Sequence, residues 1–208
     1  EYMLNWFAHK LQRPYKKMAV TICLNSGEGA GKNVILNHFE HIMGCNYDSV
    51  SSAKSILGDF NAVLEGKTLL NFDEVTYGGN HEKNNQMKAL ISEDFVHINK
   101  KNKEAYRIRS MADFIITTNE DYFIGVTGDS RRYCPMALNT RWEGVQTDES
   151  HAYFKKIMDA PPEAFAKFLY NRDISEFNPR KFSKTTLFQQ QVEKSYTSTI
   201  RWLYETLE

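Results

Sequence analysis

The chain has 208 residues, of which 26 are Lys or Arg and 26 are Asp or Glu, so its formal net charge is zero. This length suits one sizeable domain that buries roughly 70% of its unfolded surface. The balanced charge excludes binding to a polyanion through overall charge, so such binding needs local basic clusters.

No apolar run approaches the ~18 residues of a membrane span, and the N-terminus does not resemble a signal peptide. We therefore expect a soluble chain with no membrane partner. Cys23, Cys45 and Cys134 lack metal-site spacing, which predicts buried free thiols in a reducing compartment. Because the chain starts at Glu1 and ends within a helical pattern, we expect it to be a piece of a longer protein.

The first two expected elements are a helix and a strand. Residues 2–13 carry apolar side chains at helical spacing, and Pro14 would stop that helix. The apolar run 18–23 predicts a buried strand, and a helix to about residue 43 follows it.

A glycine-rich turn joins that strand to that helix. Three glycines in five positions let backbone N–H groups point inward, the helix N-terminus adds a positive dipole end, and a lysine adds a full charge. The pattern G-x-x-x-x-G-K-[ST] matches at Gly31 and Lys32, but Ser26 replaces its first glycine and Asn33 its Ser/Thr. A plain turn with an exposed lysine is the alternative. The predicted phosphate cradle comprises Gly27, Glu28, Gly29, Ala30, Gly31, Lys32 and Asn33.

After a short helix near residues 59–64, the apolar strand 68–72 ends in Asp73 and Glu74. In a nucleotide site the first carboxylate would lie near Mg²⁺ and the second would orient or deprotonate water. Many surface strands end in acids, so the pair alone is weak. Its position after a phosphate loop favours nucleotide hydrolysis involving Lys32 and both acids.

A glycine-rich turn at residues 77–80 and a helix at 82–91 precede a predicted hairpin of residues 95–98 and 105–109. Between His97 and Arg109 there are five Lys or Arg and one acid. The hairpin tip is therefore a candidate contact for nucleic-acid phosphates. A solvated turn with ordinary lysines is the alternative.

Two further candidate sites lie at the ends of predicted strands. Asn119 ends the buried strand 111–119, where it could hold an attacking water, although a strand-end cap is the alternative. Arg131 and Arg132 precede the strand 133–138 and suggest an arginine finger, unless they form ordinary ion pairs.

The remaining segments are predicted to be helical. Helices are expected at residues 150–158, after Pro161 and Pro162, and at 185–207. We divide the chain into a P-loop ATPase core with an N-terminal helix, residues 1–145, and a C-terminal helical segment, residues 146–208. The second part is expected to belong to the same domain or to start a linker.

In this order and spacing, the motifs resemble the ATPase domain of superfamily 3 helicases. More narrowly, the chain resembles the helicase domain of phage, plasmid and large-DNA-virus primase-helicases. The similarity extends past the motifs to residues 4–14, 29–33 and 171–180, so it covers nearly the whole chain.

The resemblance implies an α/β P-loop NTPase with an AAA+-like sheet core, helices on both faces and C-terminal helices. It implies ATP-dependent DNA helicase activity with Mg²⁺, a ring that is usually a hexamer with ATP at subunit junctions, and a hairpin that tracks single-stranded DNA. A fused or associated primase-polymerase and a cytoplasmic location, in a bacterial or virus-infected host cell, are also implied.

The resemblance also assigns residue roles. Gly27 to Asn33 match the phosphate loop, with Asn33 and Asp73 near Mg²⁺. The remaining matches are Asp73 and Glu74 to the strand-end acids, Asn119 to the sensor asparagine, Lys100, Lys101 and Lys103 to the hairpin tip, and Arg131 or Arg132 to the finger.

Two other functions remain open. A ring-forming scaffold that binds nucleotide with little hydrolysis, attached to a primase-polymerase, is motivated by the neutral amide of Asn33 where a hydroxyl normally meets Mg²⁺. A small-molecule kinase fits the phosphate loop, but it gives no role to Asn119, the arginines or the basic hairpin.

Overall fold

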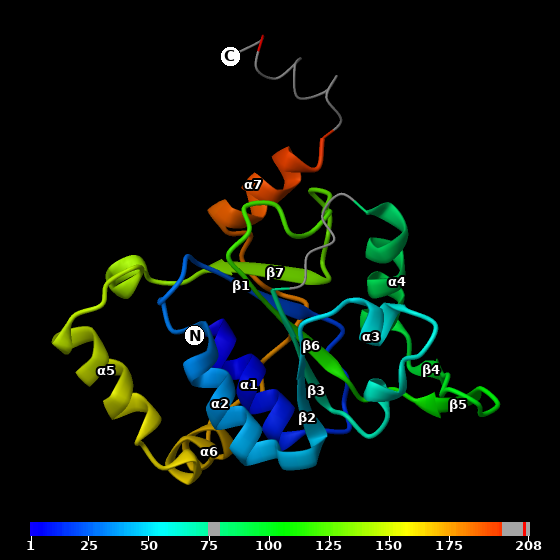
Figure 1. Ribbon diagram of the computed structural model, residues 1–208, viewed down its shortest axis with the longest axis horizontal. Helices are drawn as coiled ribbons and strands as arrows, with labels where there is room; N and C mark the ends of the chain where they lie inside the picture. The colour runs from blue at the N-terminus through cyan, green and yellow to red at the C-terminus, as the bar shows by residue number, and fades with distance from the viewer. Residues whose placement is uncertain (75–79, 197–205, 207–208) are drawn as a thin grey trace.

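The computed structural model describes residues 1–74, 80–196 and 206 (Figure 1). Its centre is a five-stranded sheet in the order β2-β3-β6-β1-β7, with every neighbouring pair parallel. The sheet and its flanking helices confirm the predicted α/β class. The strands are β1 (Thr21–Asn25), β2 (Tyr47–Val50), β3 (Leu69–Asp73), β6 (Asp113–Thr118) and β7 (Tyr133–Ala137).

Helices cover both faces of the sheet (Figure 1). Side chains alternate between the two faces along a strand, and on β1 Ile22 joins one hydrophobic cluster while Cys23 joins the other. The cluster around Ile22 includes residues of α1 (Tyr2–Gln12), α2 (Lys32–Met43) and α6 (Pro162–Tyr170). The cluster around Cys23 includes residues of α3 (Lys54–Leu57), α4 (His81–Ser92) and α7 (Thr186–Lys194).

The remaining elements lie around this core. The hairpin of β4 (Phe95–Ile98) and β5 (Tyr106–Arg109) extends from the edge opposite α5 (Asp148–Met158). Short 3₁₀ turns occur at η1 (Gly44–Asn46), η2 (Ala62–Leu64) and η3 (Thr140–Trp142). Within the described ranges, no helix combines the length and apolar character that a membrane crossing requires.

Three sequence expectations need correction. The segment expected as a helix near residues 59–64 contains only the turn η2, while the short helix α3 lies before it, where no helix was predicted. The edge strand β2 was not predicted. Cys45 is exposed because it lies in the surface turn η1, whereas Cys23 and Cys134 are buried as expected.

Two other expectations reach beyond what the structure describes. The turn predicted at 77–80 lies outside the described residues except for Asn80, which caps α4. The last helix, predicted to run to residue 207, is described as α7 to Lys194 and again at residue 206, and the rest of it lies outside the described residues.

Candidate nucleotide site

The predicted phosphate loop lies between the end of β1 and the start of α2. Gly29 and Gly31 have φ angles of +79° and +85°, which a side chain would strain, and Gly31 is the N-cap of α2. The loop therefore opens onto the first turn of a twelve-residue helix, where unpaired N–H groups favour an anion.

Lys32 folds back over this loop. Its Nζ lies 2.7 Å from the carbonyl oxygen of Ser26, 3.3 Å from that of Gly27 and 3.4 Å from that of Thr118. Thr118 ends β6, the strand that separates β1 from β3. The ammonium group is therefore held between the loop and the neighbouring strand, at the edge of the sheet where the loop opens.

The two departures from the P-loop pattern have different outcomes. Ser26 is not among the residues with positive φ, and its hydroxyl donates to the Gly27 carbonyl at 3.2 Å, so no glycine is needed there. Asn33 is exposed in the first turn of α2. Its side chain shows no hydrogen bond to any residue that the structure describes, so its amide oxygen is available to a ligand.

The strand-end acids lie at the same edge of the sheet. Asp73 pairs in register with Thr117 and accepts a hydrogen bond from its hydroxyl at 2.8 Å. Glu74 is exposed, with a φ of +56° that costs a non-glycine residue about 1 kcal/mol or more. Its N–H donates to the Thr117 carbonyl at 2.8 Å, which holds this conformation. Such backbone strain clusters at functional sites.

The donor set suits Mg²⁺ bound together with phosphates. Within the described residues, no group of three or more His, Cys, Asp or Glu could hold a metal alone. Mg²⁺ in nucleotide sites usually takes one or two protein oxygens, and phosphates and waters complete its shell. The oriented carboxylate of Asp73 and the amide oxygen of Asn33 are donors of that kind.

Asn119 directly follows β6 and is exposed. Since the preceding carbonyl, that of Thr118, accepts from Lys32, the backbone leading to Asn119 lies at the loop. Among the described residues its side chain has no hydrogen-bond partner. The strand-end cap expected as the alternative is therefore not formed by this side chain.

Arg131 and Arg132 lie at the opposite ends of the strands from the phosphate loop. The Arg132 carbonyl accepts from the N–H of Thr21, the first residue of β1, whereas the phosphate loop follows the last residue. A five-residue strand separates these ends by roughly 13 Å at about 3.3 Å per residue. Nε of Arg132 donates to the Ser92 hydroxyl at 2.6 Å. Arg131 is exposed, with no partner in the described ranges. Neither arginine therefore lies close to Lys32 of the same chain.

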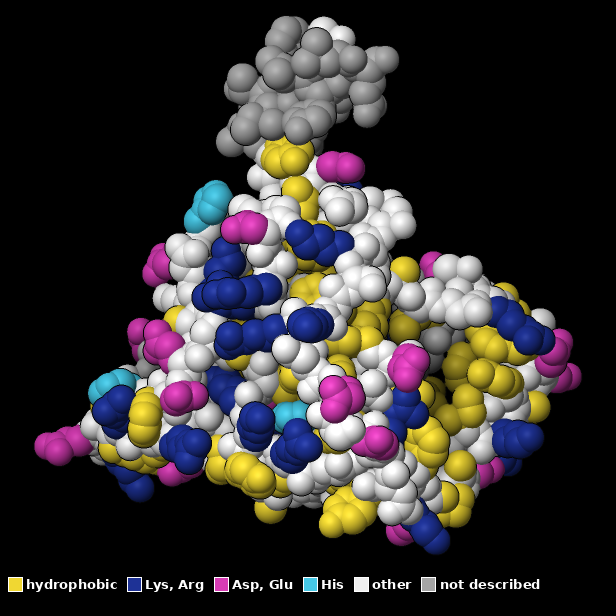
Figure 2. Space-filling model, turned by 180° about the vertical axis from the view of Figure 1, so that it is seen from behind, with side chains coloured by type: hydrophobic (Ala, Val, Ile, Leu, Met, Phe, Trp, Pro, Cys, Tyr) yellow, Lys and Arg dark blue, Asp and Glu magenta, His cyan; other side chains and the backbone are white. Residues whose placement is uncertain are grey.

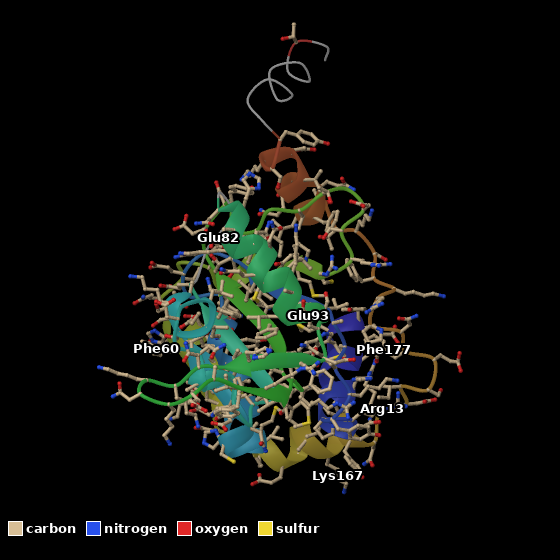
Figure 3. The ribbon with its side chains drawn as sticks, turned by 90° about the vertical axis from the view of Figure 1, so that its right-hand side faces the viewer. Arg13, Phe60, Glu82, Glu93, Lys167 and Phe177 are labelled. Carbon is tan, nitrogen blue, oxygen red and sulfur yellow. The ribbon has the colours of Figure 1, made fainter. Side chains whose placement is uncertain are left out.

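The basic hairpin forms as predicted, with β4 and β5 antiparallel, and it is anchored to the segment beside Phe60 (Figure 3). The Asn61 side chain donates to the His97 carbonyl at 2.9 Å and accepts from the Asn99 N–H at 2.8 Å. Of the tip lysines, Lys100 forms an ion pair with Glu65, while Lys101 and Lys103 are exposed.

Sequence reasoning missed the residues that approach the loop from the other side. The carboxylate of Glu143 occupies the space where a Cβ at Gly27 would lie, and the next N–H, of Gly144, donates to the Glu28 carbonyl at 2.9 Å. Phe154 of α5 lies against Gly31. These residues are more than 100 positions from the loop, and no periodicity in the sequence signals the contact.

One curated relative is a DNA primase-polymerase from Nitratiruptor phage NrS-1. It is 24% identical over 170 residues, which are 80% of this chain. The chain spans only 23% of the length of that relative. This similarity relates the chain to part of a phage primase-polymerase.

Solved structures share the fold. The apo structure of the NrS-1 C-terminal region has a TM-score of 0.82 at 22% identity, covering 95% of this chain and 47% of the other. A second NrS-1 structure, in the A form, has a TM-score of 0.81 and covers 99% of this chain and 49% of the other. The crystal structure of a substituted N-phenylacetamide bound to JCV helicase has a TM-score of 0.52 at 10% identity, covering 99% of this chain and 60% of the other.

The sequence pattern of one protein family matches residues 24–132, from the end of β1 to Arg132. The matched range contains the phosphate loop, the strand-end acids and the hairpin. Because it spans more than half of the 208 residues, the chain belongs to the family described as "Family of unknown function (DUF5906)".

Proposed function

We propose that this chain is the ATPase domain of a replicative DNA helicase. In this proposal Lys32 and the N–H groups from Gly27 to Asn33 bind ATP phosphates, Asp73 and Asn33 hold Mg²⁺, Glu74 activates water and Asn119 positions it. Bound Mg²⁺ would neutralise charge that develops on the transferred phosphoryl group.

The observation that carries the proposal is the position of Lys32 at the end of β6, next to the strand that ends in Asp73. A glycine-rich loop that only connects a strand to a helix would not require an acidic strand end close to its lysine. The similarities to a phage primase-polymerase and to a helicase fold support a role in DNA replication. They also support an associated primase-polymerase in the complete protein.

A ring is the second part of the proposal. Arg131 and Arg132 lie about one strand length from the phosphate loop of their own chain, so either could act on ATP only in a neighbouring subunit. We therefore propose an AAA+-type ring, of the hexameric kind, with ATP at subunit junctions. Arg131 is the better candidate for the finger because Arg132 is already bonded to Ser92.

The hairpin supplies the proposed contact with single-stranded DNA. Lys101 and Lys103 are exposed at its tip, where they could reach phosphates. The Asn61 and Glu65 contacts tie the hairpin to the segment that leads into β3. Movement of β3 during hydrolysis would then reach the DNA through this segment.

Residues 146–208 are proposed to belong to the same domain as residues 1–145. Leu169 of α6 is fully buried in the cluster with α1 and α2, and Phe188 of α7 is fully buried in the opposite cluster. Because these helices complete the hydrophobic clusters on both faces of the sheet, we assign them to the domain and not to a linker.

The deciding experiment is ATP hydrolysis with and without single-stranded DNA, over a series of protein concentrations. The proposal expects DNA-stimulated turnover that rises more steeply than protein concentration, because the sites form between subunits. Lys32→Ala and Glu74→Gln should each abolish turnover. Full ATPase activity in both variants would refute the assignment.

Mixing two inactive variants tests the composite site. Lys32→Ala lacks the phosphate lysine and Arg131→Ala lacks the finger, so a mixed ring contains some junctions with both groups intact. Turnover should therefore recover partly on mixing. Arg132→Ala serves as the matched comparison, and no recovery with either arginine variant would contradict a finger at this position.

A nucleotide-binding scaffold is the second candidate, favoured by the amide of Asn33 in place of a hydroxyl. It predicts tight ATP binding with no turnover at any protein or DNA concentration. Asn33→Ser would then be the informative variant, because it restores a hydroxyl for Mg²⁺ and should raise turnover.

A further inference from the structure

A cavity of about 830 Å³ lies directly beside the phosphate loop. Its walls come mainly from α2, the segment after β7 that includes η3, α5 and α6, and it touches the loop at Ala30, Gly31 and Lys32. Figure 2 shows the molecule from behind, with a hollow bordered by hydrophobic side chains on the side where α5 lies. Its volume is within the range typical of small-molecule sites.

Aromatic rings line the cavity next to the loop. Trp142 and Tyr153 lie with ring centroids 5.4 Å apart and planes 34° from each other. Phe154 lies so close to the loop that a Cβ at Gly31 would be 2.5 Å from its Cε1 atom. Tyr153 is 46% exposed, so one ring remains accessible to a ligand.

Several polar side chains of the cavity already have partners. Nε2 of His38 lies 3.0 Å from the Ile157 carbonyl oxygen. Oδ1 of Asn139 accepts from the Arg141 N–H at 2.8 Å, and the Arg141 guanidinium lies 4.5 Å over the Trp142 ring while it pairs with Glu149. Because Arg141 and Tyr153 already pack on the Trp142 ring, the exposed ring of Tyr153 is the main surface for a flat ligand.

We infer that this cavity binds the purine base of the nucleotide and recognises it by stacking on Tyr153, which Trp142 supports from the side, so that ATP and GTP bind with similar affinity. The inference rests on the proposed function, because it takes the phosphates to lie on the loop. A site that hydrogen-bonds a substrate group rejects an analogue lacking it by about 10⁴-fold, whereas an apolar site distinguishes similar ligands by roughly 10–200-fold. Stacking accepts every base, because each has a π-face.

The test is equilibrium binding of ATP, GTP and CTP to the intact chain in the presence of Mg²⁺, measured by calorimetry. ATP and GTP should bind within about tenfold of each other, and CTP more weakly because a pyrimidine offers a smaller face. Tyr153→Ala should weaken ATP and GTP binding equally, by about tenfold, and Tyr153→Phe should restore it. The matched control is Tyr170→Ala, which removes an exposed tyrosine of α6 outside the cavity.

The outcomes separate this inference from the proposed function. ATP binding more than about 1,000-fold tighter than GTP binding would overturn base recognition by stacking while leaving the ATPase in place. The same holds if Tyr153→Ala and Trp142→Ala keep wild-type affinity while Lys32→Ala loses it. If the wild-type chain binds none of the three nucleotides, the proposed function fails and the inference fails with it.

Discussion

The hydroxyl of Thr117 on β6 donates a hydrogen bond to Oδ1 of Asp73 on β3 at 2.8 Å. Thr117 is fully buried, and its backbone carbonyl also accepts from the Glu74 N–H. One residue of the strand beside the phosphate loop therefore positions both strand-end acids. Asp73 is oriented through its side chain and Glu74 through its backbone.

Replacing Thr117 by Val should impair the use of Mg²⁺ more than the binding of nucleotide. The change keeps the shape of the side chain but removes a hydrogen bond of about 1 kcal/mol, so the Mg²⁺ concentration for half-maximal turnover should rise about fivefold. Nucleotide binding without Mg²⁺ should stay the same. Thr117→Ser keeps the hydroxyl and is the control, and an equal loss in both variants would point to packing instead.

Replacing Glu143 by Gln should tighten nucleotide binding. The Glu143 carboxylate lies against Gly27, where it adds negative charge beside a site for phosphates. Removing it should strengthen ATP binding about fivefold, the equivalent of ~1 kcal/mol in a solvated site, and the gain should shrink as salt is added. Glu176→Gln, an exposed acid outside the site, is the control. Weaker binding in the Glu143 variant would instead mean that this carboxylate helps to hold the ligand.

The sequence predicted the parts of the site that are formed by residues adjacent in the chain. The strand, glycine-rich turn and helix around Lys32 are contiguous, and the acids Asp73 and Glu74 directly end an apolar strand. Parallel strands bring their carboxyl ends to one edge, so these groups could be placed together from order alone.

Contacts between distant residues could not be predicted in this way. The cavity depends on α5 packing beside a loop more than 100 residues earlier, where Phe154 lies against Gly31, and the ion pair of Lys100 with Glu65 depends on how the hairpin docks. The edge strand β2 was missed because Tyr47–Val50 has no apolar run, and only Tyr47 in it is buried. Tertiary packing, which no local pattern encodes, decides all three.

Replacing Asp113 by Asn should strongly destabilise the fold. Asp113 Oδ2 lies 2.6 Å from Nζ of Lys10, and the two side chains are 2% and 0% exposed. Asn would leave the buried ammonium of Lys10 without its counter-charge, which costs about 3–5 kcal/mol. Urea unfolding measures this loss, and Glu149→Gln, which breaks the exposed pair with Arg141, should change stability by less than about 1 kcal/mol. A loss below 1 kcal/mol at Asp113 would show that the pair is not charged in the folded state.

Changes at the hairpin tip should affect DNA binding unequally. Lys101 and Lys103 are exposed, whereas Lys100 is paired with Glu65, and together with Tyr106 it holds the pKa of that carboxyl below its usual range. Lys101→Ala and Lys103→Ala should each weaken binding to single-stranded DNA and lower its salt dependence by about 0.7 in log–log slope. Lys100→Ala should have a smaller effect on that slope. If the wild type and the three variants have equal slopes, these lysines do not contact DNA phosphates and belong to an ordinary solvated turn.

His9 should make the fold sensitive to mild acid. Its side chain is 1% exposed, and burial, together with the positive charges of Arg13, Lys10 and Lys16, lowers its pKa to about 4. In the unfolded chain the imidazole takes up a proton near pH 6.5, so the unfolded state binds more protons between pH 6.5 and 4. The stability that neutral His9 contributes is therefore complete above pH 6.5 and is lost as the pH falls towards 4.

Replacing His9 by Gln removes this titration and should flatten the pH dependence of stability. We expect the free energy of unfolding of the wild type to fall faster than that of the variant between pH 6.5 and 4.5, by up to about 1.4 kcal/mol per pH unit for one proton. Urea unfolding at several pH values measures the two slopes, and His41→Gln, at an exposed position of α2, should keep the wild-type slope. If His9→Gln and the wild type lose stability in parallel, His9 is protonated in the folded protein and the acid sensitivity arises from other groups.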